Sequence, residues 1–297
     1  MPELPEVETI RIGLQTLLPG SPVLSVDFDW PKSFPNAEAD VLQFLVGSRV
    51  VAVSRRAKVL IIGLDSGYSL VIHLKMTGQL VYVPGAAKNP SKERFGAGHP
   101  NGSLVGSLPD KSTRVTITFQ DKAVLYFNDQ RKFGWVRLLP SVEVPHIDFM
   151  KRFGPEPLED TFTQKAFTTQ LTRRARSRIK AVLLDQTIIA GIGNIYADES
   201  LWAAKIHPET RVKDISPARL KVLRTAIIDV LSLSIAKGGS TNKNYVNAEG
   251  KKGSYMDFAH VYNRTGQPCD RCGNPIQKIR SAGRGTHICL TCQREPS

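Results

Sequence analysis

The order of apolar and polar residues predicts a helix at the start of the chain and a series of strands after it. Apolar residues from Val7 to Leu18 recur three or four residues apart and Gly20 follows them, which is typical of a helix over residues 5–18. A second helix is expected over residues 37–46. Short β-branched or alternating runs separated by turns then predict strands at residues 49–53, 59–64, 69–74, 79–83, 115–119, 123–127 and 135–139. Short strands at this spacing favour an antiparallel sandwich or barrel.

The second half of the chain has apolar residues at helical spacing. The expected helices cover residues 163–172, 178–185, 195–203 and 217–237. Ser216 is the expected N-cap of the last helix, and Pro217 is its first residue. Residues 84–112 are rich in Gly, Pro and Ser and predict a long loop, either functional or mobile. Residues 141–158 contain several prolines and predict an interdomain linker.

Charge is distributed unevenly along the chain. Residues 1–150 hold 16 Lys and Arg against 14 Asp and Glu, whereas residues 151–297 hold 24 against 13, and the net charge is +13. A basic C-terminal half indicates a polyanionic partner, with nucleic acid as the first candidate and a solvated basic face as the alternative. The sequence has no run of 18 apolar residues and its first residues are acidic, so we expect neither a membrane span nor secretion, but a cytoplasmic location.

The N-terminus contains a candidate nucleophile. Removal of Met1 would leave Pro2 as a terminal secondary amine beside the carboxylate of Glu3. An α-amino group titrates at about 7.7–8.0, so part of it is unprotonated near neutrality, and its attack on a sugar carbon gives an iminium that withdraws electrons from neighbouring bonds. The alternative is purely structural, because Pro5 can begin a helix whose positive end faces Glu6.

Four cysteines form two pairs near the C-terminus. Cys269-Asp-Arg-Cys272 is followed after 16 residues by Cys289-Leu-Thr-Cys292, a spacing that can present four thiolates to one structural zinc ion. Disulfides are the alternative, but the expected intracellular setting disfavours them. Redox motifs are disfavoured because no βαβ pattern surrounds the pairs. His287 could replace one ligand, but with both pairs intact we expect it to pack nearby.

Two glycine-containing motifs in the basic half suit phosphate binding. Between the cysteine pairs, Gly283-Arg284-Gly285 lies in a segment that predicts a hairpin with a basic tip, where the glycines leave room for a phosphate backbone. Gly193-Asn194 opens a predicted helix, whose first backbone amides can bind phosphate together with the Asn side chain. Upstream, five cations within eight residues add to the basic half, with a solvated helix face as the alternative: Arg173, Arg174, Arg176, Arg178 and Lys180.

A further group of candidate DNA-binding residues lies at the predicted turns of the strand region. Lys58 begins one predicted strand, His73 ends another and Arg131 lies in a turn. Met76 and Phe133 would normally be core residues, but both lie at turns among cations. An apolar side chain in such a place can insert between DNA bases.

Together these motifs resemble those of the formamidopyrimidine-DNA glycosylase family, bacterial enzymes that repair 8-oxoguanine in DNA. The resemblance runs nearly end to end and includes both cysteine pairs. It also includes Pro2-Glu-Leu-Pro-Glu-Val-Glu8, Arg55-Arg-Ala-Lys58, His73-Leu-Lys-Met-Thr-Gly78, Arg131-Lys-Phe-Gly134, Gly154-Pro-Glu-Pro157, Gly193-Asn-Ile-Tyr196, Gly238-Gly-Ser240 and Gly283-Arg-Gly-Thr286.

The resemblance implies an α+β fold of two domains. The first would be an N-terminal antiparallel β-sandwich with flanking helices, and the second a C-terminal helix–two-turn–helix domain with a β-hairpin zinc finger. DNA would bind in the cleft between the domains. The expected boundaries are residues 1–140 for the sandwich, 141–158 for the linker, 159–260 for the helical domain and 261–297 for the zinc finger.

Single residues acquire implied catalytic roles from the resemblance. Pro2 would attack C1′ of the sugar, and Glu3 would protonate the sugar as its ring opens. Glu6 matches a further acidic position near the lesion. Lys58 and Arg284 match residues that hold phosphates beside the lesion and assist strand cleavage.

Other residues match DNA contacts of the family. His73 and Asn194 would contact phosphates. Met76, Arg131 and Phe133 would fill the space left by the extruded base, with Arg131 facing the orphan cytosine.

The implied function is base-excision repair by a bifunctional enzyme with one structural zinc ion. It would excise oxidised purines, such as 8-oxoguanine and formamidopyrimidines, from double-stranded DNA, preferably opposite cytosine. As a lyase it would then break the abasic strand by β,δ-elimination, and we expect it to act as a monomer in the bacterial cytoplasm.

Two alternatives remain open. An endonuclease VIII-like enzyme would excise oxidised pyrimidines, but that branch has Gly where this chain has Leu4, and residues 238–255 resemble a loop that covers a flipped purine. A DNA-binding protein without catalysis would keep the zinc and the basic half. The intact Pro2–Glu3 pair argues against it.

The chain departs from the family pattern in three places. Residues 84–112 are longer than the usual loop, a usual His is Ser112, and a usual Lys falls at about Ala175. We assign no role to Ser112 or Ala175.

Overall fold

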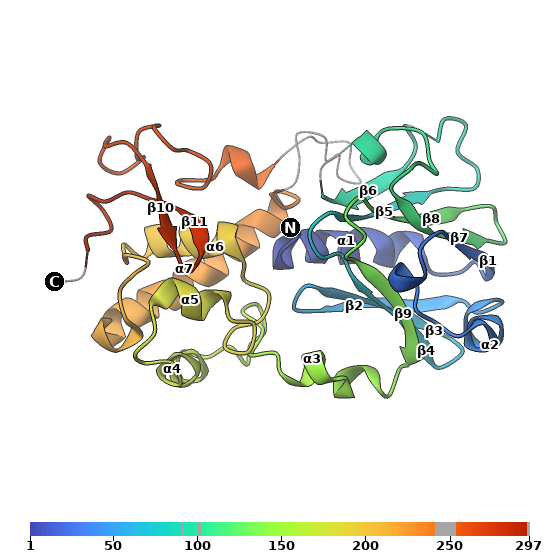
Figure 1. The fold of residues 1–297 in the computed structure, drawn as a ribbon, viewed down its shortest axis with the longest axis horizontal. Helices are drawn as coiled ribbons and strands as arrows, with labels where there is room; N and C mark the ends of the chain where they lie inside the picture. Colours follow the sequence, from blue (N-terminus) through green and yellow to red (C-terminus); the bar gives the residue numbers. More distant parts are fainter. Residues whose placement is uncertain (91, 100–101, 241–253, 296–297) are drawn as a thin grey trace. The chain divides into compact units, whose positions relative to one another are not determined.

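The computed structural model describes residues 1–90, 92–99, 102–240 and 254–295 (Figure 1). The chain divides into two compact units, which we call the sheet unit (residues 1–151 and 238–240) and the helical unit (residues 152–237 and 254–295). The division after residue 151 falls inside the segment predicted as a linker. The boundaries predicted at residues 140, 158 and 260 remain predictions.

The sheet unit contains two antiparallel sheets, one of five strands in the order β1-β7-β8-β5-β6 and one of four strands in the order β2-β3-β4-β9. All seven expected strands are present, so the predicted antiparallel architecture is confirmed, whereas β1 and β6 were not predicted. The strands are β1 (Val23–Phe28), β2 (Val50–Arg56), β3 (Val59–Leu64), β4 (Tyr68–His73), β5 (Gly78–Val83), β6 (Phe95–Gly98), β7 (Thr113–Phe119), β8 (Val124–Asp129) and β9 (Trp135–Pro140).

Helix α1 (Leu4–Leu17) contacts β2 and β3 of one sheet and β5 and β6 of the other (Figure 1). Its apolar positions are buried in the core that both sheets share, as the helical spacing predicts. The second predicted helix is shorter and less regular, because α2 (Glu38–Asp40) continues as a π-helical turn (Val41–Leu45). A further short helix, α3 (Asp148–Lys151), ends the first part of the sheet unit.

Part of the segment 84–112 is regular structure, not loop. Strand β6 pairs with β5, from Tyr82 opposite Phe95 to Gln79 opposite Gly98. The Phe95 ring packs against α1 so closely that a Cβ on Gly13 would lie 2.3 Å from it. Strand β6 is therefore built onto the core.

The helical unit contains the four predicted helices and a β-hairpin. Ser216 caps the longest helix by accepting a hydrogen bond from Arg219 N at 3.4 Å, as predicted. Within the described part of the chain, none of the helices has the length and apolar character needed to cross a membrane. The elements are α4 (Gln164–Thr172), α5 (Ile179–Leu184), α6 (Asn194–Ala203), α7 (Pro217–Ala236), β10 (Gln277–Ser281) and β11 (Arg284–Ile288).

Two consecutive buried carboxylates on α6 attach the C-terminal segment to the helices. Asp198 accepts hydrogen bonds from Lys180 Nζ at 2.6 Å and from the backbone N–H of His287 at 2.8 Å. Glu199 accepts the backbone N–H groups of residues 260, 261 and 262 at 2.8, 2.9 and 2.7 Å. Because both carboxylates are fully buried, each needs these donors to offset its desolvation.

Candidate active site and zinc centre

The N-terminal segment is fixed by the carboxylate of Glu6. Pro2 and Glu3 are buried just before α1, whereas Met1 is 48% exposed. Glu6 Oε2 accepts the backbone N–H of Glu3 at 2.7 Å, and Oε1 accepts the backbone N–H and hydroxyl of Ser240 at 2.7 and 2.9 Å. Removal of the exposed Met1 would therefore create the amine of Pro2 at a site whose backbone is already positioned.

Lys58 lies in a turn that is tied to α1. It is 7% exposed and follows Ala57, which has a φ of +53°. Arg55 Nη1 donates to the carbonyl of Ala57 at 2.8 Å, and Arg55 Nε donates to Glu8 Oε2 at 2.9 Å. These bonds fix the β2–β3 turn against the helix that begins near Pro2.

His73, the last residue of β4, is held as a neutral ring. Its Nδ1 accepts the backbone N–H of Lys75 at 3.0 Å. Burial, together with the positive charges of Lys75 and Lys58, lowers the pKa of His73 to about 3. A neutral ring that accepts through Nδ1 carries its proton on Nε2, so His73 can donate a hydrogen bond to a phosphate without being charged.

The low pKa of His73 predicts a loss of stability in acid. The ring takes up a proton at about pH 6.5 in the unfolded chain but at about pH 3 in the folded protein, so its contribution is complete above pH 6.5 and is lost as the pH falls toward 3. The free energy of unfolding should decrease by up to about 5 kcal/mol over this range. In urea unfolding between pH 7 and pH 4, the free energy of unfolding should decrease less for His73→Gln than for the wild type. Substitution of the exposed His146 by Gln is the control. Parallel curves for His73→Gln and the wild type would contradict the assignment.

Three side chains expected to enter the DNA stack are exposed at turns. Met76 is 37% exposed and Phe133 is 53% exposed, so both apolar side chains are accessible to a ligand. Arg131 is also exposed, and its guanidinium lies over the Phe133 ring at 4.7 Å from the centroid. These exposures suit insertion between bases, and the individual roles remain predictions.

In the helical unit, Asn194 and Arg284 belong to neighbouring segments. The side-chain amide of Asn194 donates to the carbonyl of Gly285 at 2.9 Å, so the N-terminus of α6 lies beside the start of β11. Arg284 is exposed there and pairs with Ser281 across a two-residue turn of Ala282 and Gly283, both with positive φ. The predicted hairpin is confirmed, with Arg284 next to its tip.

One member of the predicted basic cluster is not on the surface. Lys180 is fully buried, where its ammonium group donates to Asp198 and Thr286. The other four cations of the cluster are exposed around the turn between α4 and α5. The alternative of a solvated helix face therefore does not apply to Lys180, because its charge is bound by the buried Asp198.

The four cysteines converge as a metal-binding cluster. Their Sγ atoms all lie within 4.8 Å of one another, and among the described residues this cluster does not include His287. Burial raises the pKa of the Cys269 thiol, but hydrogen bonds from the backbone N–H of Arg271 and the indole of Trp202 outweigh it and bring the pKa to about 6. The donor set fits one structural Zn²⁺ ion, which binds thiolates. The alternative with His287 as a ligand is thus disfavoured.

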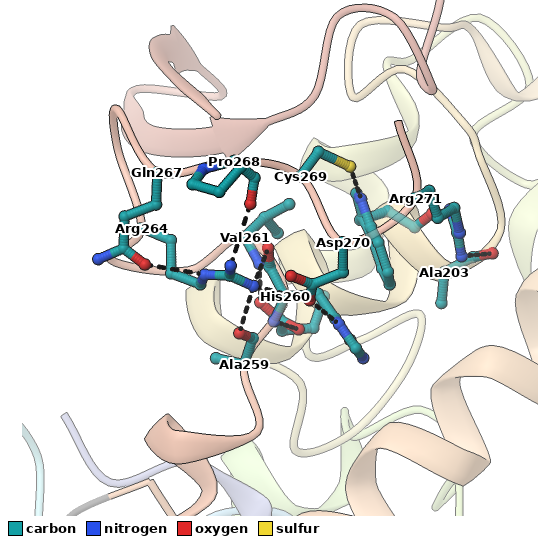
Figure 2. Close-up of polar contacts among 12 residues, drawn as sticks. Ala203, Ala259, His260, Val261, Arg264, Gln267, Pro268, Cys269, Asp270 and Arg271 are labelled. Carbon is teal, nitrogen blue, oxygen red and sulfur yellow. Dashed lines mark hydrogen bonds and ion pairs between the residues drawn. The ribbon is translucent and has the colours of Figure 1, made fainter. Parts of the chain in front are cut away.

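Residues that the motif analysis missed hold the first cysteine pair in place (Figure 2). Trp202 Nε1 donates to Cys269 Sγ at 3.4 Å, and the Trp202 ring stacks on His260 with centroids 4.2 Å apart. Asp270 binds His260 Nδ1 at 2.6 Å and Arg264 Nη1 at 2.7 Å. No motif in the sequence indicates these contacts, and the contacts of Trp202 join segments far apart in the chain.

Ser112, for which the resemblance implies His, is buried in a polar network. Its hydroxyl bonds Asp110 Oδ1 at 2.7 Å and Ser103 Oγ at 2.8 Å, and it is 2% exposed. In this structure Ser112 therefore presents no side chain to the surface.

Comparison with known proteins agrees with these observations over the whole chain. Residues 1–136 match the model of the formamidopyrimidine-DNA glycosylase N-terminal domain, residues 153–245 its H2TH domain, and residues 266–294 a zinc finger found in FPG and IleRS. The chain is 41% identical to the formamidopyrimidine-DNA glycosylase of Desulforamulus reducens and 39% identical to that of Pelotomaculum thermopropionicum, with 99% of each chain covered.

Solved structures show the same fold. A Lactococcus lactis FPG variant in complex with a Fapy-dG-containing DNA matches with a TM-score of 0.84 and 34% identity, over 99% of this chain and 100% of that one. The Lactococcus lactis Fpg in complex with abasic-site DNA gives the same values. The expected α+β fold, with antiparallel sheets, a helical domain and a zinc finger, is thereby confirmed. The chain belongs to the formamidopyrimidine-DNA glycosylase family.

Proposed function

We propose that this protein excises oxidised purines, such as 8-oxoguanine and formamidopyrimidines, from duplex DNA and then cleaves the abasic strand. The observation that carries the proposal is the buried Pro2–Glu3 pair at the start of α1, in a chain whose relatives are DNA glycosylases. A catalytically silent DNA-binding protein would have no need of a terminal secondary amine beside a buried carboxyl group.

The proposed reaction begins with the amine of Pro2. Its nitrogen bonds C1′ as the bond from C1′ to the base breaks, and the base leaves with that electron pair and takes up a proton. Glu3 protonates the sugar oxygen as the ring opens, which gives the iminium. Loss of a proton from C2′ then expels the 3′ phosphate, and a second elimination expels the 5′ phosphate.

The other candidate residues bind and deform the DNA in this proposal. Four of them contact phosphates: Lys58, His73, Asn194 and Arg284. Two of these four, Lys58 and Arg284, also assist strand cleavage. Glu6 keeps the N-terminal segment in place near the lesion. Extrusion of a base costs a few kcal/mol, and such contacts offset this cost.

Insertion of side chains completes the proposed DNA complex. Met76 and Phe133 fill the space left by the base, while Arg131 faces the orphan base and favours cytosine. We further propose that the protein acts as a monomer, and that it works on DNA in the bacterial cytoplasm, since the relatives cited above come from bacteria.

Reduction with borohydride tests the proposal directly. The wild-type protein, shown by mass spectrometry to lack Met1, should form a covalent complex with duplex DNA that has 8-oxoguanine opposite cytosine. Duplexes with normal guanine are the control, and duplexes with thymine glycol measure activity on oxidised pyrimidines. Absence of a trapped complex would reject the proposal, faster excision of thymine glycol would favour the pyrimidine branch, and a crosslinked peptide with the adduct on a lysine would reject Pro2 as the nucleophile.

A further inference from the structure

We infer that Asp129 and Thr77 are positioning residues. They join the two turns whose side chains are expected to insert into the DNA. We call these turns the Met76 turn (residues 74–78) and the Phe133 turn (residues 130–134). The inference rests on the proposed function, since it concerns how the proposed stacking residues act together. Thr77 lies in one of the quoted motifs, but neither it nor Asp129 was assigned a role from the sequence.

Asp129 is a fully buried carboxylate at the end of β8, immediately before the Phe133 turn. Its Oδ2 accepts the backbone N–H groups of Phe133 at 2.8 Å and Gly134 at 2.6 Å, and its Oδ1 accepts that of Arg131 at 3.1 Å. One carboxylate therefore fixes the backbone of Arg131 and Phe133, two of the three residues expected to enter the DNA stack. Hydrogen bonds to a charged acceptor are stronger than neutral ones.

The same carboxylate reaches the Met76 turn through Thr77. The hydroxyl of Thr77 donates to Asp129 Oδ1 and accepts the backbone N–H of Arg131 at 3.1 Å. Thr77 directly follows Met76, and its side chain is 8% exposed, so water has little access to these bonds. The Thr77 hydroxyl thus joins the Met76 turn to the Phe133 turn, because it bonds both the Asp129 carboxylate and the backbone of Arg131.

The surrounding backbone leaves Asp129 little freedom to move. Its N–H donates to the carbonyl of Ser112 at 2.7 Å, and its own carbonyl accepts Arg114 Nε at 2.8 Å. A Cβ on Gly134 would lie 3.1 Å from Asp129 Oδ2 and 2.6 Å from the Phe127 ring. The Phe127 ring leaves no room for a side chain at position 134, and the Asp129 carboxylate packs closely against the same residue.

This arrangement has a mechanistic consequence for base extrusion. Side chains that must fill one space in the duplex act together only if their backbones keep a fixed separation. The contact between Thr77 and Asp129 fixes that separation before DNA binds. Loss of the contact should slow extrusion of a stacked base, but it should leave the chemistry at an already unpaired abasic site unaffected.

The matched pair Thr77→Val and Thr77→Ser tests the inference. T77V keeps the side-chain shape and removes the hydroxyl, whereas T77S keeps the hydroxyl. In single-turnover assays, T77V should lower excision of 8-oxoguanine from a duplex about tenfold, since the lost bond is to a charged group. Its cleavage of a preformed abasic site in single-stranded DNA should stay within about twofold of the wild type. T77S should match the wild type on both substrates.

A second measurement distinguishes a positioning role of Thr77 from a general loss of folding. Because the hydroxyl of Thr77 also holds the backbone of Arg131, T77V should reduce the preference for cytosine over adenine opposite 8-oxoguanine. Thr77→Ala removes the same hydroxyl and has a smaller side chain. Like T77V, it should excise 8-oxoguanine more slowly but cleave the abasic site at nearly the wild-type rate. Equal rates for T77V and wild type on the duplex, or equal losses on both substrates, would overturn the inference. A wild-type protein inactive on both substrates would overturn the proposed function itself, and the inference with it.

Discussion

Pro2→Gly should lower excision of 8-oxoguanine by at least about a thousandfold, because the substitution replaces the nucleophile. The secondary amine of Pro2 forms an iminium that is positively charged at any pH. The primary amine of Gly forms an imine that must first take up a proton, and it is also less restricted in conformation. Single-turnover excision and borohydride trapping measure the loss, and mass spectrometry must show that Met1 is absent from both proteins.

DNA binding by Pro2→Gly, and excision by a matched variant, show whether the loss of excision comes from the chemical step alone. Pro2→Gly should bind DNA with a tetrahydrofuran abasic analogue as tightly as the wild type. Pro5→Gly makes the same substitution three residues later, within the first turn of α1, and should cost about 1 kcal/mol of stability while excision is largely kept. If both variants lost excision to the same extent, the effect would belong to the start of the helix and not to the amine.

Loss of zinc should be the second large effect. Cys269→Ser, or treatment with a chelator, should release the metal and lower DNA affinity at least a hundredfold, because zinc binding contributes about 10–16 kcal/mol to the folding of such small segments. Without zinc, the hairpin that presents Arg284 loses one of the contacts that hold it in place. Hydrogen exchange should report the change, with protection lost in residues 266–295 and kept in the sheet unit.

A substitution at His287 is the control for the zinc site. His287→Gln should keep one zinc ion per chain, measured by metal analysis, because the cluster consists of the four cysteines. His287 contacts other groups: its ring packs edge-on against Tyr262 at 4.9 Å, and its Nδ1 lies 3.5 Å from Asp198 Oδ2. A zinc-free His287→Gln protein would show that the ligand set is wrong.

Sequence periodicity predicted most regular elements, and its failures have physical causes. Strand β3 was predicted with its observed bounds, since Val59–Leu64 is a continuous β-branched and apolar run. Strand β6 was missed because Phe-Gly-Ala-Gly has little strand propensity, and it forms by pairing with β5 and packing of Phe95 on α1. Long-range pairing of this kind leaves no local signal.

Candidate site residues were found where a motif keeps them close in sequence, and missed where the fold brings them together. The spacing of the two cysteine pairs predicted a cluster of four cysteines, which the structure confirms. Asp129 stands two residues before Arg131, yet its role became apparent only from its bonds to Thr77 and to the Phe133 turn. Lys180 was grouped with surface cations, because its partner Asp198 lies on another helix.

The adjacent carboxylates of α6 stabilise segments that lie far from this helix in the sequence. Asp198 supports the strand that carries Arg284, and Glu199 supports the segment that leads into the first cysteine pair. A natural variant at either position would thus be expected to resemble one deprived of zinc, although it alters no cysteine. Repair-deficient alleles at Asp198 or Glu199 should accordingly be classed with defects of the metal-binding finger and not with those of the helical domain.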